Sequence, residues 1–259
     1  MNRILLCCLR DWRHPSAGPM EDYLFNVFSR IAAQGNHVTW ACSRRLFLAD
    51  FRRERPLRME TVDGIQVAPL GPGCLYRRAA AMLSSRLASK SGEAVQLDAL
   101  VDCVHGTPLP LEPSAHFHII PIVFDLNRKQ RGSSNPPGPI IAPSAQMRRR
   151  IINSGVPANF VVSAFTGCDT DFFVPGPALT ARPMVVAVGR GAKRVSFWLR
   201  RSLPEVDVQV IRQTLPREQR RAVYQTACLG FCGRGAEQEA LSMAASGLPV
   251  LCWSSDSSA

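Results

Sequence analysis

Two cations follow an apolar run in the second half of the sequence. Gly189 and Arg190 come directly after the run Met184–Val188, and Lys193 lies three residues further on. Arginine and lysine side chains placed together can bind an anion through charge-assisted hydrogen bonds. A glycine before them lets a ligand approach the backbone closely. The pattern predicts an anion-binding turn, with a solvated Arg–Lys pair after a strand as the alternative.

A second turn that could bind an anion lies near the N-terminus. Gly18 ends the loop between the predicted strand Ile4–Leu9 and the predicted helix Met20–Gln34, and Glu21 opens that helix. The free amides of a helix N-terminus can bind an anion. Gly18 and Glu21 are therefore predicted to form a loop that binds a phosphate or an acceptor substrate. Pro19 removes one N–H from this turn and stiffens it. An ordinary strand-to-helix turn is the alternative.

The elements that position these residues alternate between short apolar runs and helical patterns. This alternation predicts parallel sheets with crossover helices. In the first half it predicts strands at His37–Cys42, Thr61–Leu70, Leu97–Val104, His118–Phe124 and Phe160–Ala164, and helices at Leu75–Lys90 and Ala145–Asn153, the latter capped by Ser144. A second series begins at Met184–Val188 and continues through Val195–Ser202, Val206–Ile211, Arg217–Ala227, Leu229–Cys232, Ala236–Ser246 and Val250–Cys252.

The predicted fold is therefore α/β, with two Rossmann-like domains facing each other across a cleft. The first domain is predicted at residues 1–174 and the second at 184–259, and the segment 175–183 has the Pro- and Gly-containing composition of a linker. The second domain looks incomplete, so we expect either a fragment or a naturally shortened form. The polar segment 128–139 is predicted to be a mobile flap at the rim of the cleft.

Composition narrows the classes of partner. The net charge of +11 fits a phosphate-bearing substrate, an anionic membrane surface or a nucleic acid. The basic residues are dispersed and no nucleic-acid-binding signature occurs, so we expect no nucleic acid partner. The sequence has nine cysteines but no paired metal-ligand spacing, so neither a metal site nor a disulfide is expected. With no signal sequence recognised, we expect a cytoplasmic protein, with peripheral contact at the inner membrane face as a second expectation.

The order of local motifs resembles that of the GT-B retaining glycosyltransferases, specifically family 4. The most specific stretch is residues 140–177, in which Gly167, Asp169 and Pro175 follow a serine-capped helix as they do in that family. The stretches 14–39, 121–128, 185–194 and 233–253 are similar to further family motifs in the same order. The resemblance therefore covers nearly the whole chain.

The resemblance implies a nucleotide-sugar-dependent hexosyltransferase that retains the anomeric configuration. A nucleotide-diphosphate sugar would be the donor, a glycan or lipid-linked saccharide the acceptor, and no cofactor or metal would be needed. Gly189, Arg190 and Lys193 match the family's donor-binding positions, and Asp125 matches a catalytic position. Glu237 and Glu239 lie near the positions of two family glutamates that contact the donor.

Three departures keep other functions open. Phe124 stands where the family has histidine, and Arg234 and Ser242 stand where it has the two glutamates. A catalytically silent partner or sugar-binding subunit is therefore the alternative. Another Rossmann-based enzyme is a third reading, because a fold does not fix a function. The first strand is not followed by G-x-G-x-x-G, which argues against a nicotinamide dehydrogenase.

Overall fold

The computed structural model describes most of the chain as two compact units. The described residues are 1–14, 17–43, 59–70, 73–89, 97–106, 117–126, 138–164, 166–176, 183–211, 215–233 and 236–253. Unit 1 comprises Met1–Asp11 and Val27–Thr166, and unit 2 comprises Trp12–Asn26 and Gly167–Ala259. Residues 128–137 of the predicted flap and 177–182 of the predicted linker lie outside the described residues. The predicted domain boundaries stay a prediction.

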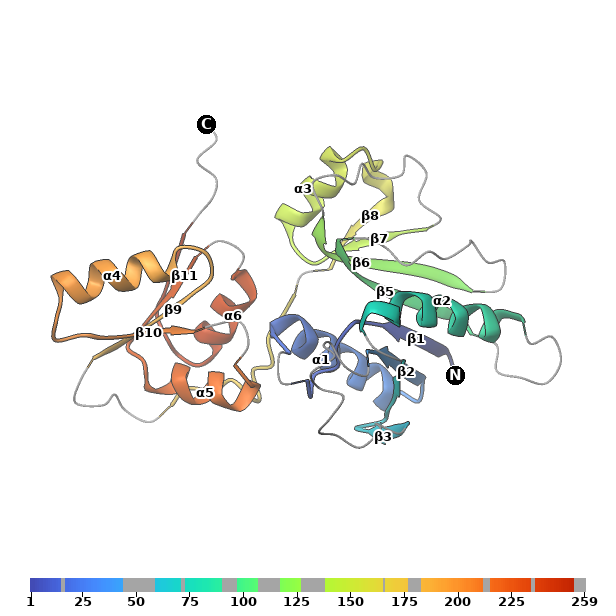
Figure 1. The fold of residues 1–259 in the computed structure, drawn as a ribbon, viewed down its shortest axis with the longest axis horizontal. Helices are drawn as coiled ribbons and strands as arrows, with labels where there is room; N and C mark the ends of the chain where they lie inside the picture. The colour runs from blue at the N-terminus through green and yellow to red at the C-terminus, as the bar shows by residue number, and fades with distance from the viewer. Residues whose placement is uncertain are drawn as a thin grey trace. The chain divides into compact units, whose positions relative to one another are not determined.

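The described residues of unit 1 contain a sheet of eight strands in the order β3-β4-β2-β1-β5-β6-β7-β8 (Figure 1). All neighbouring strands are parallel except β3 and β4, which form a hairpin around Asp63 and Gly64 and so divide the segment predicted as one strand, Thr61–Leu70. The strands are β1 (Arg3–Cys7), β2 (His37–Cys42), β3 (Glu60–Val62), β4 (Ile65–Pro69), β5 (Ala99–Gly106), β6 (His118–Leu126), β7 (Ile140–Ala142) and β8 (Val161–Ser163).

Helix α2 (Gly73–Ser89) buries its apolar face on one part of this sheet. Its Tyr76 and Ala80 pack with Leu5 of β1 and Leu100 of β5, and all four side chains are almost fully removed from water. The Tyr76 hydroxyl donates a hydrogen bond of 3.1 Å to the carbonyl oxygen of Ala41. This bond satisfies the one polar group that the tyrosine brings into the core.

Helix α3 (Ala145–Asn153) covers the other end of the sheet. Its N-cap is Ser144, whose hydroxyl accepts a 3.1 Å hydrogen bond from the Met147 N–H, as the sequence predicts. Met147 and Ile151 fall one turn apart and pack with Val161 of β8. The 3-10 turn η2 (Ala158–Phe160) leads into that strand. Strand β7, which pairs with β8, was not predicted from the sequence.

Unit 2 contains a parallel sheet of four strands in the order β10-β9-β11-β12. In chain order its elements are β9 (Met184–Val188), α4 (Ala192–Ser202), β10 (Asp207–Ile211), α5 (Arg217–Thr226), β11 (Leu229–Cys232), α6 (Glu237–Ala245) and β12 (Val250–Cys252). Unit 2 also includes the N-terminal part of α1 (Pro19–Ala33), as far as Asn26. Two sheets whose strands are parallel except for the β3–β4 hairpin, connected by crossover helices, confirm the predicted α/β class.

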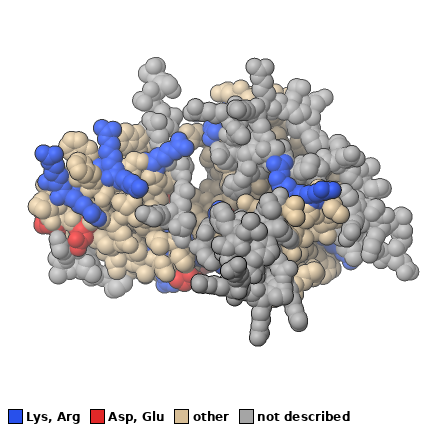
Figure 2. Space-filling view, in the orientation of Figure 1, with Lys and Arg blue, Asp and Glu red and all other residues tan. Residues whose placement is uncertain are grey.

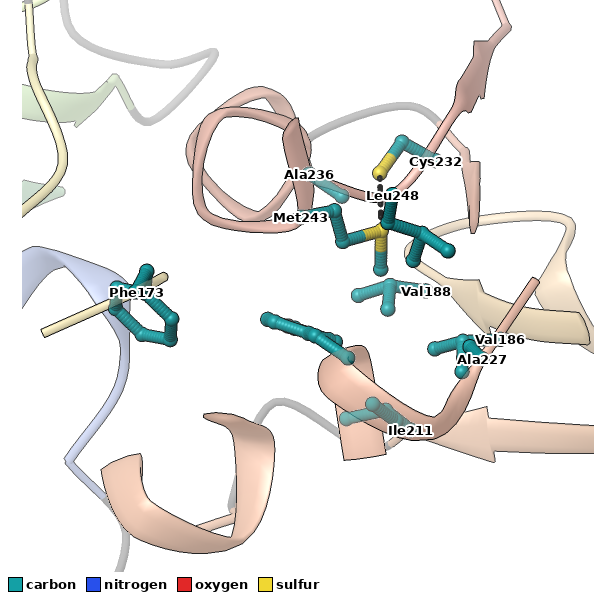
Figure 3. Packing of buried hydrophobic residues seen from close by; sticks show 10 residues of the cluster. Phe173, Val186, Val188, Ile211, Ala227, Cys232, Ala236, Met243 and Leu248 are labelled. Carbon is teal, nitrogen blue, oxygen red and sulfur yellow. Dashed lines mark hydrogen bonds between the residues drawn. The ribbon is translucent and has the colours of Figure 1, made fainter. Parts of the chain in front are cut away.

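The core of unit 2 lies between the sheet and helices α5 and α6 (Figure 3). Val186 and Val188 of β9 are fully buried there, beside Tyr224 of α5 and Met243 of α6. The Cys232 thiol lies 3.7 Å from the Met243 sulfur. Strand β9 has four of its five residues buried, which is typical of a central strand in a parallel sheet.

No helix within the described part of the chain is both long enough and apolar enough to cross a membrane.

Candidate functional site

The strand order of unit 2 creates a place where a ligand can enter. From β9 the chain crosses through α4 to β10 on one side, whereas from β11 it crosses through α6 to β12 on the other side. The loops that leave β9 and β11 therefore diverge at the carboxyl ends of two adjacent strands. In open α/β sheets, ligands bind at this type of topological switch point.

The two diverging loops touch through their backbones. Gly233 directly follows β11, and its N–H donates a 2.7 Å hydrogen bond to the Val188 carbonyl oxygen. A Cβ atom on Gly233 would lie 2.0 Å from the carbonyl oxygen of Arg190, and one on Gly189 would lie 2.9 Å from that of Gly233. Gly189 also has a φ of +84°, which a side chain would strain. Glycine is required on both sides of this contact.

The predicted clamp residues follow this contact directly. Arg190 and Lys193 are both exposed, so their cationic groups are open to solvent. Lys193 lies in the first turn of α4, and the Ala192 N–H bonds back to the Gly189 carbonyl oxygen at 3.2 Å. The structure thus brings Gly189, Arg190 and Lys193 together at the switch point of unit 2. An exposed guanidinium and an exposed ammonium three residues apart are suited to binding an anion.

Helix α6 begins from the other loop of the switch point. Ala236, which precedes it, is buried, and residues 234–235 lie outside the described residues. The Glu237 side chain is also outside the described part, so its predicted donor contact stays a prediction. Arg190 follows β9 and α6 follows the adjacent parallel strand β11, so the amides of the first turn of α6 and Arg190 come from the same carboxyl edge of the sheet. Such amides carry partial positive charge toward an anion.

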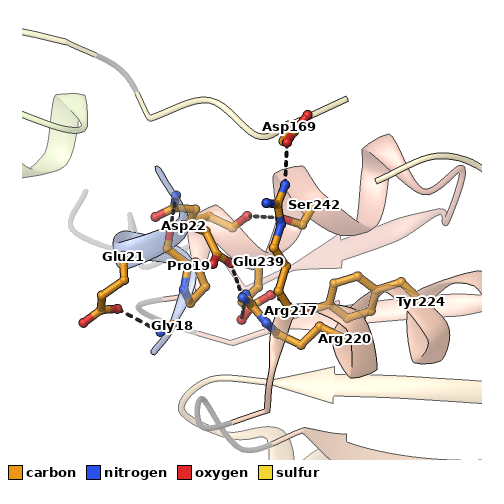
Figure 4. Close-up of polar contacts among 11 residues, drawn as sticks. Gly18, Pro19, Glu21, Asp22, Asp169, Arg217, Arg220, Tyr224, Glu239 and Ser242 are labelled. Carbon is orange, nitrogen blue, oxygen red and sulfur yellow. Dashed lines mark hydrogen bonds and ion pairs between the residues drawn. The ribbon is translucent and has the colours of Figure 1, made fainter. Parts of the chain in front are cut away.

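Glu239 lies in a buried polar cluster rather than at an open surface (Figure 4). One carboxylate oxygen accepts from Arg220 at 3.3 Å, and the other accepts the hydroxyl hydrogen of Tyr224. Arg220 is 0% exposed and also bonds Asp22 of α1. The donor-binding role predicted for Glu239 stays a prediction, and it would require these contacts to open.

Burial controls the electrostatics of this cluster. Burial raises the pKa of Glu239 and of Asp22, and the Arg220 guanidinium opposes both increases. Burial and the neighbouring Glu239 carboxylate raise the pKa of Tyr224, which keeps its hydroxyl protonated as a donor. One buried cation facing two carboxylates is a costly arrangement to break, because the loss of Arg220 would leave both anions in the interior.

The loop after β1 is closed by a helix cap. The Gly18 N–H donates a 2.8 Å hydrogen bond to a Glu21 carboxylate oxygen, and both residues are buried (Figure 4). This is the arrangement in which a glutamate in the first turn satisfies the N-cap amide. The side-chain amide of Gln238 donates to the Pro19 carbonyl oxygen at 2.6 Å. The phosphate-loop role of Gly18 and Glu21 stays a prediction, and it would require the cap to open.

The motif residue Asp169 ties the segment after Thr166 to α5. Its carboxylate accepts from the N–H groups of Asp171 and Phe172 at 3.1 and 3.2 Å, and it pairs with Arg217. The Arg217 guanidinium lies 3.9 Å from the centre of the Phe172 ring. Burial opposes ionisation of Asp169, but the Arg217 hydrogen bond and charge outweigh it and lower the pKa of Asp169. These contacts show how the Asp-Thr-Asp-Phe turn is held in place.

Asp125 belongs to unit 1, whereas the residues described above belong to unit 2. It is in β6 and pairs with His105 of β5, just after an irregularity in the strand register. The side chains of both residues are outside the described part of the structure, so the catalytic role of Asp125 stays a prediction.

Sequence reasoning missed Arg220, Asp22 and Tyr224. Asp22 and Arg220 are 198 positions apart, and each occurs in a helix where a charged residue is ordinarily solvated. The available signal was local. Tyr224 and Arg220 fall one turn apart on α5, which puts a charge on the same face as a large aromatic side chain. Among the described residues, no three His, Cys, Asp or Glu side chains lie close enough to hold a metal ion.

Three solved structures have folds similar to that of this chain. The catalytic domain of starch synthase IV from Arabidopsis thaliana, bound to ADP and acarbose, matches with a TM-score of 0.59 and 12% identity, over 100% of this chain and 86% of that one. The apo lipopolysaccharide outer core galactosyltransferase WaaB matches with a TM-score of 0.54 and 11% identity, over 97% and 80%. HepE from Anabaena, in complex with UDP, matches with a TM-score of 0.50 and 11% identity, over 97% and 80%.

The chain therefore has a fold similar to that of the GT-B glycosyltransferases. No family model matches the sequence, and no curated protein matches it either. At 11–12% identity the similarity concerns the fold, and the assignment of chemistry depends on the residues of this chain.

Proposed function

We propose that this protein binds a nucleotide-diphosphate sugar at the switch point of unit 2 and transfers the sugar to a saccharide or lipid-linked acceptor. The observation that carries the proposal is the backbone contact between Gly189–Arg190 and Gly233, with the exposed Arg190 and Lys193 beside it. Two of the three similar structures contain a nucleoside diphosphate, ADP in one and UDP in the other.

In this proposal the clamp acts on the leaving group. The bond between the anomeric carbon and the diphosphate oxygen breaks, and a bond from an acceptor oxygen to the same carbon forms. The nucleoside diphosphate leaves with the electron pair, and the acceptor oxygen loses its proton. Arg190 and Lys193 neutralise the growing negative charge, which lowers the barrier to this step. Glu237 is proposed to accept hydroxyls of the donor, and Asp125 to act on the acceptor side.

Calorimetric titration of the full chain with UDP-, GDP- and ADP-sugars tests donor binding. Arg190→Ala should weaken binding by about 2–3 kcal/mol, or roughly 30- to 150-fold, because a charge-assisted contact is lost. Lys193→Ala should weaken binding less, since an ammonium is a single point charge. Arg201→Ala is the matched control, because Arg201 is exposed in the last turn of the same helix.

Binding to one donor, weakened by the Arg190 and Lys193 substitutions and unchanged by the control, would support the proposal. Equal binding by both clamp variants and wild type would overturn the clamp assignment. Transfer is then tested by hydrolysis of the bound donor and by incorporation of labelled sugar into saccharide acceptors.

A catalytically silent partner or sugar-binding subunit is the second candidate. The observation that favours it is that both carboxylate oxygens of Glu239 are held by Arg220 and Tyr224. Ser242 is also buried, at a position where the resemblance leads one to expect a glutamate. This reading predicts that the protein neither hydrolyses nor transfers a nucleotide sugar. Failure to bind any nucleotide sugar at millimolar concentration would favour a silent partner with a vestigial donor site, whereas binding without turnover would favour a sugar-binding subunit.

A further inference from the structure

Helix α4 presents two large aromatic side chains to water. Ala192 and Ser196 are buried against the rest of unit 2, whereas Phe197 is 62% exposed and Trp198 is 55% exposed. Their rings contact each other edge to face, with centroids 6.3 Å apart. Single exposed apolar side chains are common on proteins, but an adjacent aromatic pair on one helix leaves a large apolar area unpartnered.

The charged residues of α4 surround this pair. Arg194, Phe197, Trp198 and Arg201 follow the spacing i, i+3, i+4, i+7 and therefore share one face of the helix. All four are exposed, so one turn on either side of the aromatic pair carries an arginine. The sequence of α4 contains no acidic residue. Figure 2 shows Lys and Arg side chains gathered over the region where α4 lies.

The charged residues next to the aromatic pair in the sequence add to the positive charge around it. Arg200 is exposed and donates a 2.8 Å hydrogen bond to the Val208 carbonyl oxygen, which holds its cationic group beside the helix. The nearest acidic residues in sequence, Glu205 and Asp207, come after the helix has ended. An aromatic centre with a cationic margin is the pattern of a helix that lies in the plane of a bilayer interface.

We propose that the face formed by Arg194, Phe197, Trp198 and Arg201, here called the α4 surface, docks on a lipid bilayer that contains anionic lipid. The two aromatic rings enter the boundary between headgroups and acyl chains, where tryptophan is enriched, and the arginines contact lipid phosphates. Docking goes beyond the proposed sugar transfer, because it needs neither Arg190 nor a donor.

A bilayer fits the α4 surface better than a nucleic acid does. Proteins that stack bases combine their aromatic side chains with a positively charged groove that follows the phosphate backbone. Here the aromatic pair lies on the outer face of one helix, with cations one turn before and one turn after it. This arrangement matches a flat surface whose charge lies above an apolar layer.

Vesicle co-sedimentation of the full chain tests the proposal. Wild-type protein should bind vesicles of phosphatidylcholine mixed with phosphatidylglycerol, and not vesicles of phosphatidylcholine alone. Added salt should weaken binding, because it screens the arginines. Phe197→Ser with Trp198→Ser should weaken binding about tenfold or more, because it removes the apolar insertion. Arg194→Ser with Arg201→Ser should weaken binding roughly 25-fold, or about fivefold for each charge.

Two controls separate docking from general attraction. Arg149→Ser with Arg150→Ser removes the same charge from exposed positions of α3, which has no aromatic pair, and should change binding much less. Tryptophan fluorescence provides the second control. Trp198→Phe should abolish a vesicle-induced blue shift, whereas Trp253→Phe should retain it, although Trp253 is 51% exposed.

Three results would overturn the proposal. The first is equal binding of wild type and the Phe197/Trp198 variant to anionic vesicles. The second is a change in oligomeric state with the variant instead of a change in vesicle binding, which would make the α4 surface a self-association site. The third is tighter binding of a single-stranded RNA than of anionic vesicles by the same face. Donor titration of the same variant should match wild type, so failure of docking and failure of donor binding can be told apart.

Discussion

Gly233 and Arg190 are in backbone contact, so that even a methyl group on Gly233 would lie 2.0 Å from the Arg190 carbonyl oxygen. The contact joins the loops after β9 and β11 at the switch point of unit 2, where the donor is proposed to bind. A change on one loop must therefore move the other, and the first prediction depends on this coupling.

Gly233→Ala should weaken nucleotide-sugar binding and lower the thermal midpoint. The nearest atoms are backbone atoms of Arg190, which cannot rotate away, so the Arg190 loop must shift. Overpacking of this type typically costs about 1–3 kcal/mol. Calorimetry and a thermal melt measure the two effects. The control is Gly167→Ala, because a Cβ there would meet nothing within 4 Å. Unchanged binding by Gly233→Ala would show that the Arg190 loop does not hold the donor.

Arg220→Met should destabilise the protein by about 3–5 kcal/mol near neutral pH. Methionine fills similar space but leaves the Asp22 and Glu239 carboxylates buried without a cation. Urea unfolding measures the loss of stability. The control is Arg201→Met, which makes the same substitution at an exposed position.

The loss in Arg220→Met should become smaller as the pH falls. Without the arginine, burial raises the pKa of both carboxylates in the folded state above the values of the unfolded chain. The folded variant then binds more protons than the unfolded one, so its stability increases as the pH falls toward the unfolded pKa. Unfolding experiments at about pH 7 and about pH 5 compare the loss of stability under the two conditions. A loss that is constant or larger at low pH would contradict the charge explanation.

Tyr224→Phe should destabilise the protein more than Tyr76→Phe. Both changes remove one buried hydroxyl donor, but Tyr224 bonds the Glu239 carboxylate whereas Tyr76 bonds a backbone carbonyl. Hydrogen bonds to charged groups contribute about 1.5–3 kcal/mol, against about 0.5–1.5 kcal/mol for neutral ones. Chemical unfolding of the two variants provides a direct comparison, and equal losses would argue against a charged Glu239.

Asp169→Asn should lower stability by about 1 kcal/mol at neutral pH, since the pair with Arg217 is partly exposed. The pKa of Asp169 is depressed in the folded protein, so its contribution is present above the ordinary aspartate range. The contribution is lost as the pH falls through the depressed value, and wild type and variant should then converge. Asp171→Asn is the control, because that exposed residue contributes only its backbone N–H to the turn.

Local patterns were sufficient to predict most elements of the fold. Strands His37–Cys42, Met184–Val188 and Leu229–Cys232 have the predicted bounds, because each is a short, mostly apolar run that ends where the predicted pattern ends. The Ser144 cap was equally predictable, because the hydroxyl bonds an amide only three residues away. Strand β7 was missed because its three residues are too few to show a period.

In the candidate site, too, local groupings of residues could be predicted from the sequence and long-range contacts could not. Gly189, Arg190 and Lys193 are within five positions of one another, so their grouping is visible in the sequence. The burial of Glu239 is not visible in the sequence. It depends on Arg220, 19 positions away, and on Asp22, 198 positions from that arginine. Nothing in the sequence near Glu239 indicates that its charge is already compensated within the protein.

The membership of Trp12–Asn26 in unit 2 affects the order in which this protein can fold. Its partners Arg220 and Gln238 follow much later in the chain, at separations of 198 and 219 positions. Asp22 must therefore stay without Arg220 until that residue has been synthesised, and closing so long a loop is slow compared with forming local contacts. Unit 2 is expected to mature after unit 1, and a chaperone that holds the N-terminal segment would act on unit 2 as well.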